Sequence, residues 1–271
     1  MDGEFGDRIK AWPKAAPVSA TGQVPAAWPK TARNKVRRYP DRGSYEEPDI
    51  YRILDAALLC HVAYNIDGQP YCTPTSFWRE GDRLFWHGSS ASRMLRQLGK
   101  GIPACLTVCH MDGLVLARSA FHHSINYRSV MAFGTAQLLE GSDEKAQALR
   151  AFVNRYFPGR YEATKAPHPQ EVKGTTIISM RIEEASAKTR SGPPRDDEAD
   201  YASPIWAGVI PVQTVVGEIV DCPRQHPKAR RGEDVALYRR GQRLDEVLTE
   251  AAHASSHVNG AAVGAARMRF R

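Results

Sequence analysis

A serine-rich run that ends in arginine is the first stretch of the chain with the chemistry of a binding site. It reads Trp86-His87-Gly88-Ser89-Ser90-Ala91-Ser92-Arg93 and lies where an apolar strand gives way to a helix. The free amide groups and partial positive charge of a helix N-terminus attract anions. Gly88 permits close approach to the backbone, the serines add hydroxyl donors, and Arg93 adds a guanidinium for phosphate oxygens. The run therefore predicts a phosphate site, and the alternative is a serine N-cap beside a solvated arginine.

A second polar run, residues 118–130, connects two predicted strands. It brings together His122, His123, Ser124, Asn126, Tyr127, Arg128 and Ser129. Loops this dense in hydrogen-bonding groups are typical of binding sites, and the alternative is a polar turn with one histidine bonded to the strands. Adjacent histidines in extended chain point to opposite faces, so they do not easily share one metal ion. We expect a binding site here without zinc.

The five cysteines predict neither a metal site nor a disulfide framework. Cys105 and Cys109 would stand roughly 13 Å apart along a strand, too far to ligate one ion. Cys60 and Cys72 fall on neighbouring predicted strands but not directly opposite each other, which disfavours a disulfide. The first residues lack the apolar segment of a secretory signal, so we expect a cytoplasmic location.

The net charge of +7 is concentrated at the two ends of the sequence. Residues 1–42 have nine Lys/Arg against four Asp/Glu, a net charge of +5, and residues 222–271 have ten against five, again +5. Residues 43–221 have 18 against 21, a net charge of −3. A nucleic-acid-binding domain would carry its basic residues on its folded face, so we expect no nucleic-acid partner. Because no apolar run is long enough to cross a bilayer, we expect no membrane partner either.

Composition changes at the same two boundaries. Residues 1–42 form a Pro/Ala-rich basic arm that repeats Ala-Trp-Pro-Lys at 11–14 and 27–30. Residues 222–271 form an Arg/Ala-rich tail with some helical spacing at 243–252. We predict flexible extensions, the C-terminal one partly disordered, around one folded domain at 43–221.

Apolar periodicity and turn residues define the elements of that domain. Asp67-Gly68 predicts a two-residue hairpin that places Ile66 opposite Gln69, Val62 opposite Thr73 and His61 opposite Pro74. Helices are predicted at 44–58, after 88–93 and at 143–157, the last with Leu149, Phe152, Val153 and Phe157 inside. Strands are predicted at 59–65, 71–78, 83–87, 102–110, 114–121, 127–140, 175–184 and 205–215. Many short antiparallel strands with a few helices predict a mainly β fold, a barrel with helical lids.

Several motifs in sequence order resemble a known family. The chain is similar to the pyridoxamine 5′-phosphate oxidase-like superfamily of FMN-binding split barrels, and within it to the flavin-nucleotide-binding branch that includes nitroimidazole-resistance reductases. The resemblance covers about 43–211 and rests on Arg42–Tyr45, Ile53–Ala57, Cys60–Val62, Asp67–Pro70, Leu84–Ser89, Ser119–Ser124, Asn126–Val130, Lys188–Pro194 and Trp206–Val209.

The resemblance implies a homodimer with FMN at the subunit interface. It assigns Ser89, Ser92 and Arg93 to the phosphate, on the same loop as His87 and Gly88. It places Thr75, Ser76 and Phe77 along the isoalloxazine ring. The same pocket would be lined by Tyr127, Arg128 and Ser129 and closed by Lys188, Arg190 and Trp206.

Three functions follow as hypotheses. The first is an FMN-dependent oxidoreductase acting on a small molecule, with nitroaromatics as one candidate class and His61 or His123 as an assisting acid. For His61 the alternative is a strand histidine satisfied by a neighbour. The second is a haem-binding or haem-degrading split barrel with His61, His122 or His123 as axial ligand. The third is a non-catalytic flavin carrier or sensor whose basic extensions bind a partner.

Overall fold

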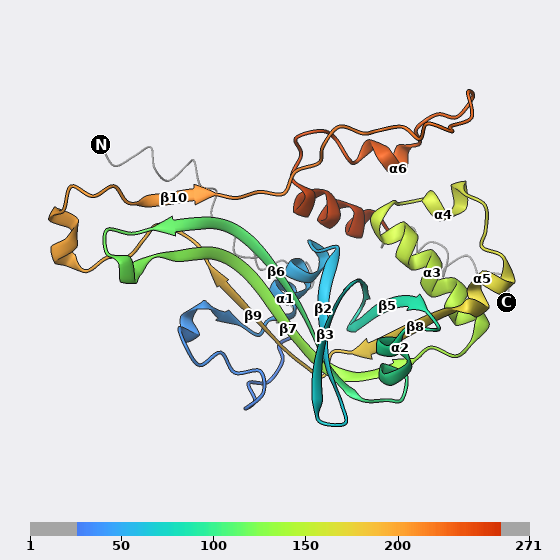
Figure 1. Cartoon of the computed structure of the whole chain (residues 1–271), viewed down its shortest axis with the longest axis horizontal. Coiled ribbons are helices and arrows are strands. Elements are labelled where there is room, and N and C mark those ends of the chain that lie inside the picture. The colour runs from blue at the N-terminus through green and yellow to red at the C-terminus, as the bar shows by residue number, and fades with distance from the viewer. Residues whose placement is uncertain (1–25, 256–271) are drawn as a thin grey trace. The chain divides into compact units, whose positions relative to one another are not determined.

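The computed structural model describes residues 26–255 and divides the chain into two compact units. Within that range the first unit comprises 26–54, 107–132 and 184–213. The second unit comprises 55–106, 133–183 and 214–255. Figure 1 traces the elements of both units along the chain. The first Ala-Trp-Pro-Lys copy, at 11–14, lies outside the described residues.

The strands of the described chain form one ten-stranded sheet with the path β3-β2-β6-β7-β8-β5-β4. The strands are β1 (Gly43–Ser44), β2 (Leu59–Ile66), β3 (Gln69–Ser76), β4 (Trp78–Glu80), β5 (Arg83–Ser89), β6 (Pro103–Leu116), β7 (Ser124–Leu138), β8 (Thr175–Arg181), β9 (Glu184–Arg190) and β10 (Gly208–Pro211). The α-helices are α1 (Glu47–Asp55), α2 (Arg93–Leu98), α3 (Ser142–Tyr156), α4 (Arg160–Ala163), α5 (Pro169–Gly174), α6 (Glu233–Ala236) and a helix over 244–255. The predicted mainly β, antiparallel split-barrel class with helices is confirmed. Of the helices between residues 26 and 255, none combines the length and apolarity needed to cross a membrane.

The β2–β3 hairpin forms in the predicted register. Asp67 and Gly68 both have positive φ, 50° and 83°, as a two-residue type I′ turn requires. Ile66 pairs with Gln69, and the ladder continues to Leu59 opposite Ser76. Because side chains alternate along a strand, Cys60, Val62 and Tyr64 are buried while His61 is exposed on the other face.

The core of the second unit is built on β5. This strand pairs with β4 on one side and β8 on the other, with Trp86 opposite Ile178. Trp78 and Phe85 stack with their ring centroids 5.4 Å apart, and Ala148 and Ala151 of α3 pack on the same cluster. Burying a side chain of this size contributes about 2–3 kcal/mol of stability, so this cluster fixes α3 on the sheet.

Helix α3 has the predicted bounds within one residue, and Leu149 and Phe152 pack against the core as predicted, but the prediction for Phe157 is wrong. Phe157 is 41% exposed and caps the helix end, with its N–H bonded to the Val153 carbonyl. Arg155, Asn154 and Tyr156 are buried instead. The Arg155 guanidinium donates to the carbonyls of Asp55 and Leu248, so long-range partners bury a residue that periodicity places in solvent.

Strand β6 runs without interruption through Asp112-Gly113, where we predicted a turn. In the first unit Gly113 pairs with Pro211 of β10, and a Cβ at this glycine would lie 3.0 Å from Val209 Cγ1. The glycine therefore serves close strand approach rather than a turn. Asp112, the other residue of the predicted turn, accepts hydrogen bonds from Arg128 and forms an ion pair with it.

The N-terminal arm packs within the first unit from residue 26 onward. Trp28 donates its backbone N–H to the Tyr45 carbonyl. Its ring meets that of Tyr51 edge-on, with the ring centroids 5.7 Å apart. Asn34 is 3% exposed and donates to the carbonyls of Pro29 and Ala185. The second Ala-Trp-Pro-Lys copy thus has a packing role.

The C-terminal segment packs within the second unit. In the helix over 244–255, Val247 and Ala251 are 0% exposed. The Leu248 carbonyl accepts from Arg155, and the Tyr238 hydroxyl donates to the Tyr156 carbonyl. Residues 214–255 therefore differ from the tail that the sequence predicted, because the apolar spacing at 243–252 finds a buried surface.

We predict that Arg155→Met lowers the free energy of unfolding by about 3 kcal/mol, because it orphans two buried carbonyls. Urea unfolding followed by circular dichroism measures this. Arg150→Met on the same helix is the matched control, because Arg150 is half-exposed and its ion pair with Glu162 is worth less than about 1 kcal/mol. Equal losses in both variants would contradict the role given to Arg155.

Candidate functional site

The turn between β5 and α2 holds the predicted phosphate loop. The Ser92 N–H donates to the Ser89 carbonyl at 2.9 Å, and the Ala91 N–H donates to the Ser89 hydroxyl at 3.2 Å. A Cβ at Gly88 would lie 3.1 Å from Leu95 Cδ1, so glycine lets α2 pack close to the end of β5. The sequence therefore folds here into a tight turn that presents its serines at the surface.

The polar side chains of this loop face outward and have unused hydrogen-bonding groups. Within residues 26–255, the hydroxyls of Ser90 and Ser92 make no hydrogen bond. The Arg93 guanidinium lies 4.4 Å from the ring centroid of Tyr71 on β3, a cation–π contact that keeps its donors near the loop. Two hydroxyls and a guanidinium at one turn can bind an anion.

Two threonines that the sequence analysis missed lie beside this loop. In the β5–β8 ladder Thr175 pairs with Ser89 and Thr176 pairs with Gly88. Both threonines are half-buried, and Thr175 donates its hydroxyl to the Glu171 carbonyl. No local signal marks them, because 86 residues separate Ser89 from its partner Thr175 and only the strand pairing brings them together.

Two of the three residues predicted to lie along the flavin ring are on β3, and the third follows it directly. Thr75 and Ser76 are half-buried at its end, with Thr75 opposite Cys60 and Ser76 opposite Leu59. Phe77 is 1% exposed, and its carbonyl accepts from the Tyr156 hydroxyl. The Phe77 side chain therefore belongs to the core, and the two hydroxyl residues are the ones that reach the surface.

His87 is a half-buried histidine in an aromatic setting. Its ring lies 4.5 Å from Phe152 and 5.9 Å from Trp78, measured between centroids. Its Nδ1 is buried and has no hydrogen-bond partner among residues 26–255. Burial lowers the pKa of His87, which favours the neutral imidazole.

Arg128 occupies the interior of the first unit. It is 2% exposed and binds Asp112 with two hydrogen bonds, Nε to Oδ2 at 2.9 Å and Nη2 to Oδ1 at 2.6 Å. Its neighbours in β7, Tyr127 and Ser129, lie on the opposite, half-buried face. Ser129 donates to the carbonyl of Lys188 on β9, which places these predicted residues side by side.

Arg190 organises the loop that follows β9. It is 7% exposed and donates to the side chain of Asn126 and to the carbonyls of Gly192 and Pro193. Burial, with Arg42 and Arg195 nearby, lowers the pKa of Arg190. Trp206, the last predicted residue of this set, is 65% exposed.

A buried carboxylate anchors the same loop. Asp196 accepts the backbone N–H groups of Arg118 and Ser119 and the Arg118 guanidinium. Burial opposes its ionisation, but these hydrogen bonds prevail and hold the pKa of Asp196 below its ordinary value. Sequence reasoning missed Asp196, because an aspartate in a polar loop resembles a solvated one.

The two histidines predicted to assist catalysis are both exposed. His61 lies on the outer face of β2 beside Leu59, which is 60% exposed. His123 Nδ1 lies 3.0 Å from the Ser119 carbonyl, which fixes the ring and leaves Nε2 outward. His122 faces Asp197 at 3.5 Å, so the adjacent histidines have different partners.

The sixteen predicted site residues divide between the two units. The second unit holds His61, Thr75, Ser76, Phe77, His87, Gly88, Ser89, Ser92 and Arg93. The first unit holds His123, Tyr127, Arg128, Ser129, Lys188, Arg190 and Trp206. Each set is organised within its own unit, and their joining around one cofactor stays a prediction.

Comparison with known proteins gives one family and two well-covered structures. The family model described as pyridoxamine 5′-phosphate oxidase matches residues 46–189. The flavocytochrome Anf3 from Azotobacter vinelandii is 45% identical, with a TM-score of 0.74 over 78% of this chain and 98% of its own. The FAD and heme binding protein from Mycobacterium smegmatis is 34% identical, with a TM-score of 0.71 over 75% of this chain and 98% of its own.

A more distant structure and the curated proteins add less. A 5-nitroimidazole antibiotic resistance protein from Bacteroides thetaiotaomicron is 21% identical over 54% of this chain and 85% of its own, with a TM-score of 0.45. Similarity at that level carries no argument about a substrate. No curated protein matches the chain.

We predict that the cofactor-free protein loses stability between pH 7.5 and pH 5.5 in part through His87. Its folded-state pKa is lowered, so below the unfolded pKa of about 6.5 the unfolded chain binds a proton that the folded chain resists. Urea midpoints at both pH values measure the loss, which should be smaller in His87→Phe. His226→Phe, at an exposed histidine, should lose as much as the wild type; an unchanged loss in His87→Phe would refute the assignment.

Proposed function

Because the chain belongs to the pyridoxamine 5′-phosphate oxidase family, we propose that it is a redox protein that binds both a flavin and haem. One observation carries the proposal: 45% identity along 98% of a flavocytochrome. The second relative, 34% identical along 98% of its length, is named for FAD and heme. Two relatives of different origin with the same pair of cofactors support the pair more than either cofactor alone.

The β5–α2 loop is the part of this chain that fits a flavin phosphate. Ser90, Ser92 and Arg93 offer donors at one exposed turn. We predicted FMN, whereas the Mycobacterium smegmatis relative is named for FAD. Both flavins carry a phosphate, so the loop serves either. When bound, the flavin supplies the electron-transfer chemistry, and these residues bind and orient it.

His87 is the histidine that best fits a haem iron. A ligating imidazole must be neutral, and burial between Phe152 and Trp78 favours that form. The buried Nδ1 of His87 has no hydrogen-bond partner among residues 26–255. His61 and His123, the ligands suggested by the sequence, are exposed, and His122 faces a carboxylate. Haem bound here would supply one-electron chemistry, with the aromatic walls excluding water.

The reaction we propose is oxidoreduction of a small molecule. No dinucleotide fingerprint is present, so the electrons need not come directly from a nicotinamide. A nitroaromatic substrate stays a hypothesis from the sequence resemblance. The carrier or sensor hypothesis predicts instead a flavin that no small substrate reoxidises, which separates the two by turnover.

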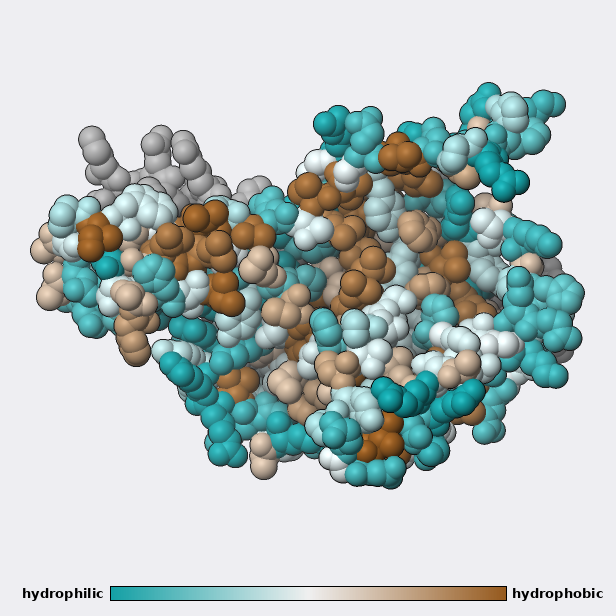
Figure 2. All heavy atoms as spheres, viewed as in Figure 1, coloured by the Kyte–Doolittle hydropathy of each residue, from teal (hydrophilic) through white to brown (hydrophobic). Residues whose placement is uncertain are grey.

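We also propose that the protein is a homodimer, joined through an apolar face of the first unit. Figure 2 shows hydrophobic side chains gathered over β6, β7 and β10. The exposed apolar side chains that these strands contribute in the first unit include Met111, Leu114, Ile125, Met131 and Ile210, each between 42% and 52% exposed. Exposed apolar patches of this kind mark protein interfaces. A cytoplasmic location agrees with the five cysteines, all of which are free thiols.

We predict that the purified protein shows both flavin absorbance and a Soret band. His87→Ala should remove most of the Soret band and leave the flavin in place. His61→Ala and His123→Ala are matched variants at exposed histidines, and each should keep the band. Loss of the band only in one of those two would move the ligand to that residue, and its absence from the wild type after haem addition would reject haem binding.

We predict that Arg93→Ala lowers flavin affinity roughly 10- to 100-fold, the cost of about 1.5–3 kcal/mol for one charge-assisted hydrogen bond. Fluorescence titration of the cofactor-free protein with FMN and FAD measures both affinities. Lys100→Ala removes the same charge just after α2 and should change them less than about threefold. Equal affinities in Arg93→Ala and the wild type would remove the phosphate loop from the site.

A further inference from the structure

A groove in the C-terminal segment of the second unit lies apart from every residue discussed for the cofactors. Its volume is about 450 Å³, and its walls come from 217–219, 231–232, α6 and 238–240. Residues 217–232 contain no helix or strand. A segment of that length without regular structure, inside a folded unit, is commonly a functional loop.

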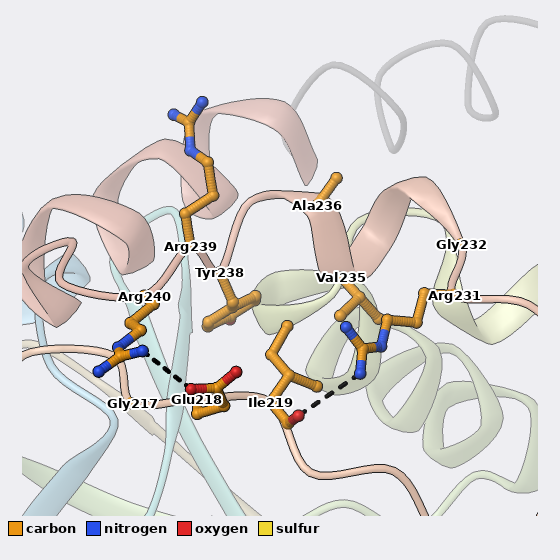
Figure 3. Close-up of a pocket in the computed structure, with 10 residues that line it drawn as sticks. All are labelled: Gly217, Glu218, Ile219, Arg231, Gly232, Val235, Ala236, Tyr238, Arg239 and Arg240. Carbon is orange, nitrogen blue, oxygen red and sulfur yellow. Dashed lines mark hydrogen bonds and ion pairs between the residues drawn. The ribbon is translucent and has the colours of Figure 1, made fainter.

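The groove has an apolar floor between two basic ends. Figure 3 shows Ile219 and Tyr238 between Arg240 on one side and Arg231 on the other, with Val235 beside Arg231. The floor is held in place from below, because the Tyr238 hydroxyl donates to the Tyr156 carbonyl and its ring packs 5.4 Å from Phe157. A preformed floor reduces the ordering cost of binding.

The segment that forms the groove is mainly positively charged. Residues 217–243 include seven Lys/Arg against four Asp/Glu, a net charge of +3, whereas residues 43–221 carry −3. The arginines at the ends pair with Asp221 at 3.0 Å and Glu218 at 2.9 Å. All four of these side chains are 49% exposed or more, so each pair contributes little and can exchange for a partner's carboxylate.

The separation of Arg231 and Arg240 favours an extended ligand over a compact one. A compact phosphate needs converging donors, but Arg231 and Arg240 stand at opposite ends of the floor, and the Arg239 guanidinium points away from it (Figure 3). An extended segment can reach both ends and lay an apolar side chain on Ile219 and Tyr238 between them. We propose that this groove docks an acidic segment of a partner protein, with carboxylates at both arginine ends and one apolar side chain on the floor.

The test uses the full-length protein and a fluorescein-labelled peptide, Glu-Asp-Glu-Leu-Glu-Asp-Glu, in fluorescence anisotropy at low ionic strength. We expect saturable binding that weakens with added salt. The double variant R231E/R240E should weaken it roughly tenfold or more, and replacing the peptide's leucine by serine should weaken it severalfold. The single variant Arg240→Glu breaks only an exposed ion pair, which adds little stability, and should still weaken binding about threefold.

The matched control is R224E/K228E, with the same charge change in the same segment but outside the groove lining. It should weaken binding less than about twofold, and circular dichroism should show all variants folded. Should the double variant unfold, Arg240→Glu and the serine peptide decide. Equal loss in groove and control variants, no saturable binding, or displacement of the peptide by ATP at lower concentration would each overturn the proposal.

Discussion

The second unit depends most on the hydrogen bonds and the ion pair that the buried Arg155 guanidinium makes. It joins the last turn of α1, through the Asp55 carbonyl, to the helix over 244–255, through the Leu248 carbonyl. The Asp55 carboxylate lies 3.8 Å from Arg155 and also binds Arg79 of β4. Burial lowers the pKa of Arg155, and the pairing with Asp55 opposes that shift. A buried cation is stable only with such partners, so it specifies where three distant segments must meet.

Helix α3, which Arg155 holds in place, also supports residues with candidate binding roles. Tyr156, next to Arg155 in α3, donates to the Phe77 carbonyl and accepts from Tyr238. Phe152, one turn earlier, packs against His87 at the end of β5. The aromatic wall of His87 and the floor of the groove therefore both rest on one helix. A disturbance of α3 would reach both, whereas the first-unit residues are organised separately by Arg128, Arg190 and Asp196.

Ion pairs serve different purposes in this protein according to their burial. Arg128 and Asp112, like Arg118 and Asp196, form pairs with one partner almost wholly buried, which fix backbone positions at the cost of desolvation. The pairs around the groove are exposed, and they add little stability but leave charge available to a partner. Burial, rather than residue type, separates structural arginines from those free to bind.

The sequence by itself determined the features that local sterics dictate. Asp67-Gly68 set the hairpin and its register, because few other residues adopt positive φ at both turn positions. The serine-rich loop followed from the same local chemistry. Tertiary structure alone decided that Arg155 and Arg128 are buried, that β6 continues through Gly113, and that Thr175 joins Ser89. The reason is that desolvation, pairing and strand contact depend on partners 16 to 100 residues away, which no local pattern encodes.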